Sequence, residues 1–204
     1  MNKEAEDIKM IREMMEKSSK FLSFNGLSIV FAGIFALIGA TVAYLFLNEI
    51  IDCVEYDMKL KMIILLIDAS AVLFLSVCSV TFFCWKKART NNESLFNSTT
   101  RRATYSLLLP LFAGGIFSLF FISTGDVSIA YATTLTFYGL GLVNTSKYTF
   151  SEINILGITL VTLGISALLF ANLSLYIWAT GFGVCHIIAG FIMYFRYENK
   201  NKAK

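Results

Sequence analysis

Two ionisable side chains lie inside long apolar runs of the sequence, where they could carry chemistry. Asp68 lies in the run 60–85, and His186, the only histidine of the chain, lies in the run 173–195. Placing an ionisable group inside a lipid bilayer costs about 2.5–3.5 kcal/mol on insertion scales, so such groups are the first candidates for a functional site. A carboxylate and an imidazole at this depth could pass a proton or hold a small polar molecule.

Polar side chains also follow one face of the run 127–144. They recur at the spacing of three or four residues that places side chains on one side of a helix. The members of this polar stripe are Tyr131, Thr134, Tyr138, Gly141 and Asn144. A second stripe, in the run 173–195, contains His186, and its members are Tyr176, Ala179, Gly183, His186, Gly190 and Tyr194. We therefore expect the imidazole to face protein rather than lipid.

Asp68, His186 and the polar stripe allow two interpretations. If they converge, the interior of the protein could hold a hydrogen-bonded network, a small-molecule pocket or a proton relay. Alternatively, neighbouring hydroxyl groups satisfy Asp68 and His186, which then only fix the register of the helices. The sequence leaves both interpretations open.

The sequence carries none of the motifs that would indicate an enzyme or a bound cofactor. A single histidine excludes a bis-histidine haem within one chain, and zinc motifs such as H-E-x-x-H are missing. Residues 164–167 resemble the G-x-S-G turn of a serine intramembrane protease, but they lack its final glycine and lie in the middle of an apolar run. We predict a non-enzymatic protein with no catalytic, cofactor-binding or metal-binding residues.

The elements that position these residues follow from the composition. Hydrophobic residues make up 56% and charged residues 15% of the 204-residue chain, whereas soluble domains average about 25% charged residues. The long apolar runs have the length of membrane-spanning helices, and they cover residues 21–47, 60–85, 107–123, 127–144, 153–171 and 173–195. Because the backbone of a lipid-exposed segment must satisfy its own polar groups, each run is expected to be a helix. The predicted fold is an all-α polytopic membrane protein, a bundle of six transmembrane helices.

Lysine and arginine residues determine the predicted orientation of these helices. Fifteen of them fall in the N-terminal segment, the second and fourth connections and the C-terminal tail, whereas two fall on the other side. Basic residues collect on the cytoplasmic side of membrane proteins, so both termini should be cytoplasmic. The predicted organisation is a cytoplasmic amphipathic helix over 1–20, the membrane domain over 21–196 and a basic tail over 197–204. The net charge of +3 reflects this bias and does not indicate nucleic-acid binding.

Small residues at helical spacing predict the faces along which these helices pack closely, because lipid tails do not drive helices together. The predicted positions are Ala32, Gly33, Ala36, Gly39 and Ala40, Gly157, Gly164 and Ala171, and Ala179, Gly183 and Gly190. Pro110 is expected to bend its helix. Residues 149–152 have the pattern of a capping box at the start of a helix.

Two segments outside the bilayer could bind a partner protein. Residues 3–20 predict a helix with Ile8, Ile11 and Met15 on one face, and its nearly balanced charge favours protein contact over anionic lipid. The basic segment 86–106 contains Arg101 and Arg102. Together these residues form the predicted cytoplasmic docking face. The alternative is that residues 3–20 only extend the first span and that the basic segment only sets topology.

Several short segments resemble a family of uncharacterised bacterial membrane proteins with six spans. They lie at 7–9, 11–23, 26–28, 32–33, 138–140, 142–144, 146–149 and 186–188, and they extend over nearly the whole chain. The resemblance implies a bacterial cytoplasmic membrane, and it transfers no catalytic or binding residue because the family carries no established activity. It also implies that a small winged-helix regulator accompanies the protein, in a membrane-linked signalling or stress role.

Two functions are compatible with these features. The first is a non-enzymatic membrane sensor or regulatory protein that docks a cytoplasmic partner. The alternative is a small-solute or proton-coupled transporter or channel that uses Asp68, His186 and the polar stripe. Expected partners are the lipid bilayer, a cytoplasmic regulatory protein and a second copy of the chain, with no cofactor and no nucleic acid.

Overall fold

A computed structural model describes residues 25–47, 58–90 and 97–198, and every long element within them is a helix. Five helices are α2 (Gly26–Leu47), α3 (Met58–Thr90), α4 (Ser98–Thr124), α5 (Val127–Thr145) and α6 (Ser151–Leu169). They are followed by the C-terminal helix, which consists of α7 (Ser174–Ala179), the π-helical segment Thr180–Cys185, α8 (His186–Met193) and a π-helical end, Tyr194–Glu198. Short 3-10 turns at Ser146–Tyr148 and Ala171–Leu173 join α5 to α6 and α6 to α7. The predicted all-α fold is confirmed for the described residues.

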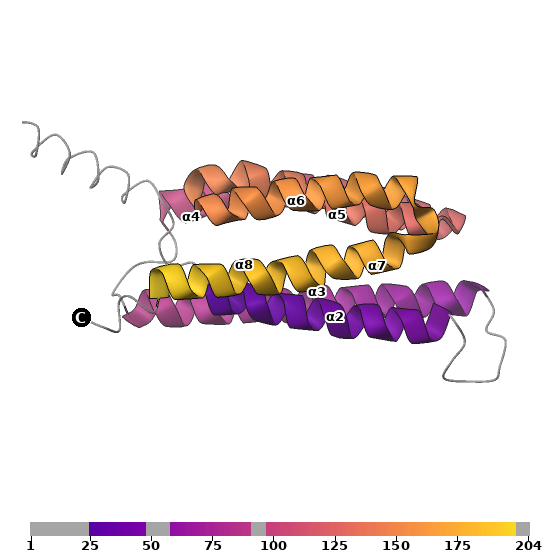
Figure 1. Ribbon diagram of the computed structural model, residues 1–204, viewed down its shortest axis with the longest axis horizontal. Coiled ribbons are helices and arrows are strands. Elements are labelled where there is room, and N and C mark those ends of the chain that lie inside the picture. Colours follow the sequence, from indigo (N-terminus) through magenta and orange to yellow (C-terminus); the bar gives the residue numbers. More distant parts are fainter. Residues whose placement is uncertain (1–24, 48–57, 91–96, 199–204) are drawn as a thin grey trace, which may run out of the picture.

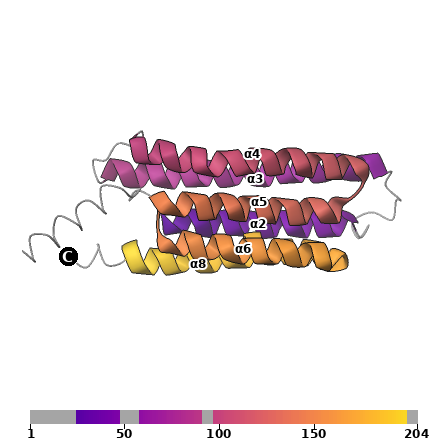
Figure 2. The same ribbon diagram turned by 90° about the horizontal axis from the view of Figure 1, so that it is seen from above.

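The helices run side by side along one axis in two layers (Figures 1 and 2). One layer contains α4, α5 and α6, with α5 packed against both of its neighbours. The other contains α2, α3 and the C-terminal helix. The C-terminal helix joins the layers, since it packs along α2 and also contacts α5 and α6, whereas α2 is the main neighbour of α3.

Five of the described helices are long and apolar enough to cross a membrane: α2, α3, α4, α6 and the C-terminal helix. Their outer surfaces are strongly apolar, with Phe74 on α3 exposed to 69% and Leu109 and Phe112 on α4 to 74% and 72%. A soluble monomer rarely exposes such large contiguous apolar areas. These features are those of a multi-pass membrane protein.

The predicted fourth span, 127–144, coincides with α5, which is not among these five helices. Threonine, tyrosine and asparagine are spread along α5, so it has no continuous stretch as apolar as those of α4 and α6. These polar residues lie on a helix that is surrounded by protein, and its Ala132 and Leu135 are 0% exposed. The hydropathy of α5 therefore reflects a position inside the bundle rather than at its lipid-facing surface.

Glycine contacts bring the helices together. A Cβ atom on Gly139 of α5 would lie 2.7 Å from the carbonyl oxygen of Gly157 of α6. In the other layer, a Cβ atom on Gly190 of α8 would lie 2.7 Å from the carbonyl oxygen of Gly26 of α2. The predicted small-residue faces match these interfaces, except that Ala171 lies exposed in the turn after α6.

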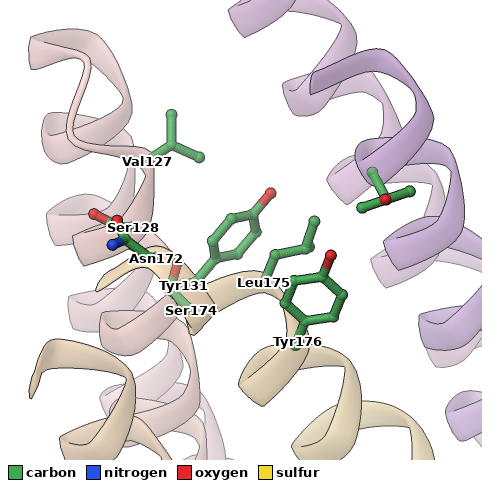
Figure 3. A pocket seen from close by; sticks show the side chains of 8 residues that line it. Val127, Ser128, Tyr131, Asn172, Ser174, Leu175 and Tyr176 are labelled. Carbon is green, nitrogen blue, oxygen red and sulfur yellow. The ribbon is translucent and has the colours of Figure 1, made fainter. Parts of the chain in front are cut away.

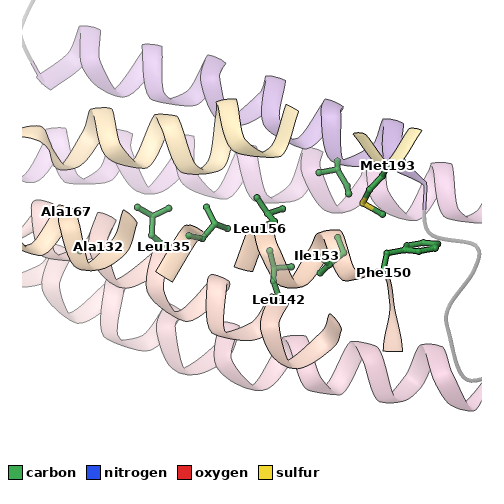
Figure 4. Close-up of a cluster of buried hydrophobic side chains, with 10 residues drawn as sticks. Ala132, Leu135, Leu142, Phe150, Ile153, Leu156, Ala167 and Met193 are labelled. Carbon is green, nitrogen blue, oxygen red and sulfur yellow. The ribbon is translucent and has the colours of Figure 1, made fainter. Parts of the chain in front are cut away.

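Buried apolar side chains fill the space between the layers (Figure 4). They come from α2, α5, α6, the turn before α6, and α8, and they are Ile29, Ala132, Leu135, Leu142, Phe150, Ile153, Leu156, Leu160, Ala167 and Met193. This core holds α5 and α6 against the C-terminal helix.

Two local predictions need correction or comment. The capping box at 149–152 is not formed: the residue before α6 is Phe150, which makes no side-chain cap, and the Thr149 hydroxyl donates to the Thr145 carbonyl instead. Glu152 does not turn back to the helix start because it binds groups of the C-terminal helix. The helix α4 continues through Pro110 from Ser98 to Thr124.

The two ends of the bundle differ in charge. At one end α3 stops, α4 begins and α5 turns into α6 (Figures 1 and 2). We call it the basic end because it carries Lys86, Lys87, Arg89, Arg101, Arg102, Lys147 and Arg196. At the opposite end, α4 turns into α5 through Gly125, whose φ of 90° suits glycine, and Asp126. The described lysines of that end are Lys59 and Lys61 in the first turn of α3.

Candidate functional site

A pocket of about 300 Å³ lies between α2, α5 and α7 at the opposite end of the bundle (Figure 3). Its walls combine aromatic, hydroxyl, amide and aliphatic side chains, namely Tyr44, Val127, Ser128, Tyr131, Asn172, Ser174, Leu175 and Tyr176. The rings of Tyr44 and Tyr176 lie with their centroids 6.0 Å apart. This mixture suits a small molecule with both polar and apolar parts.

Tyr131 extends from α5 into this pocket (Figure 3). Its hydroxyl group is buried and makes no hydrogen bond to any of the described residues. Buried polar groups in folded proteins nearly always have a partner, because leaving one unpaired costs about 1–3 kcal/mol. The hydroxyl therefore lies beside the pocket with its hydrogen-bonding capacity unused, and a ligand would reach it only if the ring moved.

Asp68 of α3 lies against α2. Its carboxylate passes the backbone of Gly39 on α2, where an added Cβ atom would lie 3.3 Å from Oδ2 of Asp68. The glycine thus leaves room for the carboxylate, which lies beside the helix that supplies the lining residue Tyr44.

An aromatic column continues from the pocket along the interface between α5 and the C-terminal helix. The ring centroids of Tyr131 and Trp178 are 6.0 Å apart, and those of Trp178 and Phe182 are 4.8 Å apart. Phe182 then packs against Tyr138 at 5.1 Å. The indole Nε1 of Trp178 donates to the Thr134 hydroxyl at 3.0 Å.

The sequence analysis missed Trp178 and Phe182. Together with His186 they recur every four residues, a spacing that places side chains on one helix face. The spacing of four residues could have predicted that Trp178, Phe182 and His186 lie on one face of the C-terminal helix.

His186 ends the column and is held from both sides. Its Nδ1 lies 2.9 Å from the Gly181 carbonyl oxygen, and its Nε2 lies 3.3 Å from the Tyr138 hydroxyl. Since a carbonyl can only accept, Nδ1 carries the proton, and in the neutral ring Nε2 accepts from Tyr138. The side chain is 3% exposed. These bonds describe a neutral imidazole that faces protein.

The predicted stripe around His186 does not lie on one face. Gly183 packs against Leu37 and Gly190 against Val30, both of α2, whereas His186 faces Tyr138 of α5. The π-helical turn Thr180–Cys185 separates these directions, because its wider turn shifts the register of the residues that follow it. Buried glycines and the imidazole thus serve different helix interfaces.

Asn144 and Gly141 of the polar stripe lie apart from the column. The Asn144 amide donates to the Ser106 carbonyl oxygen of α4 at 3.2 Å, and Gly141 packs against Leu107 of the same helix. The stripe therefore divides. Tyr131, Thr134 and Tyr138 face the C-terminal helix, whereas Asn144 stabilises the contact with α4.

A cluster of polar side chains around Glu152 lies at the basic end, and it was not predicted from the sequence. The carboxylate of Glu152, 7% exposed, accepts from Nη1 of Arg196 at 2.7 Å and from the Tyr197 hydroxyl at 3.1 Å. The Ser151 hydroxyl donates to the same carboxylate at 3.2 Å. This Glu152 cluster ties the start of α6 to the end of the C-terminal helix.

The predicted docking face is described only in part. Arg101 and Arg102 are exposed on the first turns of α4 at the basic end. Ile8, Ile11 and Met15 lie outside the described residues. Within the described ranges, no group of three His, Cys, Asp or Glu side chains could hold a metal ion.

Comparison of the chain with family models, curated proteins and solved structures gives no match in any of the three. The assignment of a role therefore depends on the geometry of the pocket and the column beside it.

Proposed function

We propose that this protein crosses the membrane six times with both termini in the cytoplasm of a bacterial cell. The support for a sixth crossing is the path of α5. It begins where α4 ends, at the opposite end of the bundle, and it turns into α6 at the basic end (Figure 1). If α4 and α6 each cross the bilayer, α5 has to cross between them. The support for the orientation is the basic end, since lysine and arginine favour the cytoplasmic side.

Single-cysteine labelling tests this topology. In a variant without the native cysteines, Lys147→Cys should react only with reagent supplied to the cytoplasmic side, and Thr124→Cys only with reagent supplied outside. Both residues are exposed; Thr124 lies shortly before α5 and Lys147 shortly after it. If both variants were labelled from the same side, the proposed crossing by α5 would be wrong. If each were labelled from the side opposite to the one expected, the proposed orientation would be wrong.

We further propose that the protein is a non-enzymatic sensor that binds a small molecule in the pocket from outside the cell. The observation that carries this proposal is a pocket open at one end above a filled interior. Leu135 and Leu160 below it are both 0% exposed, and an added Cβ atom on Gly181 would lie 2.6 Å from Leu135. Such a site suits detection better than passage. The basic end, with Arg101 and Arg102, would present the cytoplasmic docking face for a regulatory partner.

A screen of small solutes by thermal unfolding of the purified protein tests the sensor. A solute present at 100 times its Kd should stabilise the folded protein by about 2.7 kcal/mol. Ser128→Phe should abolish this stabilisation because it fills the pocket, whereas Ser70→Phe, on the exposed surface of α3, should retain it. Equal responses in both variants, or no response to any solute, would contradict the proposal.

The second candidate function is a proton-coupled transporter. It is favoured by the polar side chains that α5 directs at the C-terminal helix, where Thr134 accepts from Trp178 and Tyr138 donates to His186, and by Asp68 on α3. Proteoliposomes separate the two functions. A sensor should bind its solute without moving it, whereas a transporter should show flux that Asp68→Asn abolishes while binding and folding persist.

A further inference from the structure

We propose that the pocket binds a small organic cation, of the alkylammonium class. This inference rests on the proposed function, because it takes the pocket to be the ligand site of the sensor. It goes further in assigning the charge and chemical class of the ligand.

The aromatic walls of the pocket are the first argument. Tyr44, Tyr131 and Tyr176 approach it from three different helices, and none of the eight lining residues carries a charge. The face of a tyrosine ring attracts a cation electrostatically, and cages of aromatic rings are a common way to recognise alkylammonium groups. A lining without lysine or arginine also offers no cationic side chain to an anion.

The carboxylates nearby are the second argument. Asp68 lies against Gly39 of α2, the helix that carries the lining residue Tyr44. Asp126 directly precedes the lining residues Val127 and Ser128, and it lies exposed at the rim, where it accepts from the Thr124 hydroxyl at 3.0 Å. Carboxylates near an uncharged pocket make its potential more negative.

The distribution of charge over the whole protein agrees with these local features. The pocket lies at the end of the bundle that is poor in basic residues, since its lining residues Val127 and Ser128 begin α5 there. Between Leu47, the last residue of α2, and Met58, the first residue of α3, the sequence contains four acidic and no basic residues. This composition favours cations over anions.

The size and polar atoms of the pocket narrow the choice further. A volume of about 300 Å³ is at the lower limit for small-molecule sites. Ser128 and Asn172 could bind a hydroxyl or amine group attached to the cation. Choline has both an alkylammonium group and a hydroxyl group at this scale, so it is a suitable probe.

Fluorescence of Trp178 measures binding, since its ring lies 6.0 Å from that of Tyr131. The second tryptophan, Trp85, is removed by Trp85→Phe so that only Trp178 reports. Choline chloride should change the emission in a saturable way. The neutral isostere 3,3-dimethylbutan-1-ol, which has the same shape without the charge, should bind at least about tenfold more weakly.

Single substitutions identify the side chains that bind choline. Tyr176→Leu removes one ring and should weaken choline binding about tenfold. Its control is Tyr105→Leu, which removes an exposed tyrosine from α4 near the basic end and should leave binding unchanged. Asp68→Asn should also weaken binding about tenfold. Because Asp68 lies within the bundle, Asp126→Asn at the exposed rim provides a second charge variant, with an expected loss of about twofold.

The outcomes separate this inference from the proposed function. Equal binding of choline and its neutral isostere, or no effect of either charge variant, would overturn a cation site while leaving a ligand pocket intact. A second outcome would also overturn the cation site alone. In it, choline does not bind, but a neutral or anionic solute stabilises the protein and Ser128→Phe abolishes that stabilisation. Absence of any pocket-dependent binding would overturn both.

Discussion

Replacement of Gly157 by alanine should lower the free energy of unfolding by about 3 kcal/mol. An added Cβ atom at this position would lie 2.8 Å from the Gly139 carbonyl oxygen and 2.8 Å from the Val143 backbone nitrogen, both of α5. Backbone atoms cannot rotate away as a side chain can, so α5 and α6 would have to separate. Close packing at small residues is the main attraction between helices in a membrane, and separation would loosen the core around Leu135 and Leu160.

The matched control is Gly115→Ala on α4, where no atom lies within 4 Å of an added Cβ atom. Alanine favours a helix over glycine by about 1 kcal/mol, so this change should be neutral or slightly stabilising. Reversible unfolding in mixed micelles, followed by circular dichroism, gives both values. Similar losses of stability for the two substitutions would refute the proposed role of the Gly139–Gly157 contact.

Replacement of Glu152 by alanine should be the second large effect, with a loss of about 2 kcal/mol. The carboxylate is buried and accepts hydrogen bonds from Arg196, Tyr197 and Ser151. Since the Arg196 side chain is 62% exposed, water can solvate it once its partner is gone, which keeps the loss below that of a fully buried ion pair. The stacking of Phe150 on Tyr197, at 4.3 Å between centroids, should weaken as well.

A double-mutant cycle separates the ion pair from the rest of the Glu152 cluster. Glu152→Ala and Arg196→Ala should be coupled by about 1 kcal/mol. Ser151→Ala removes one exposed hydroxyl from the same carboxylate and should cost about 0.5 kcal/mol or less. Strict additivity of Glu152→Ala and Arg196→Ala would mean that the C-terminal helix is not held through this pair.

The helices were predictable from the sequence because each depends on a local property. The runs 60–85 and 107–123 lie within α3 and α4, and 127–144 lies within α5, since apolar side chains in a continuous run specify a helix without reference to other segments. The basic residues at one end of the bundle were visible for the same reason. The small residues at Gly33, Gly183 and Gly190 also indicated helix contacts, because only small side chains permit them.

The pocket and the column were harder to predict because they depend on how each helix is rotated about its axis. The sequence analysis placed His186 and Gly183 on one face, whereas the π-helical turn directs them to different neighbours. Trp178 joins Tyr131 to Phe182 only because the C-terminal helix lies against α5, which no pattern within 173–195 specifies. Glu152 was assigned to a cap because its partner, Arg196, is 44 residues away in the chain.

Because α3 lies at the edge of the bundle, it should unfold locally before the helices at the centre. Leu65, Cys84 and Ala88 are the buried side chains of its described residues, and α2 is its principal protein neighbour. Lipid therefore supplies most of its surroundings, whereas α5 is enclosed by α4, α6 and α7. Local opening costs least where few protein contacts are broken. Amide hydrogen exchange should reach α3 long before α5, and thinning of the bilayer should perturb the edge of the bundle while its centre stays folded.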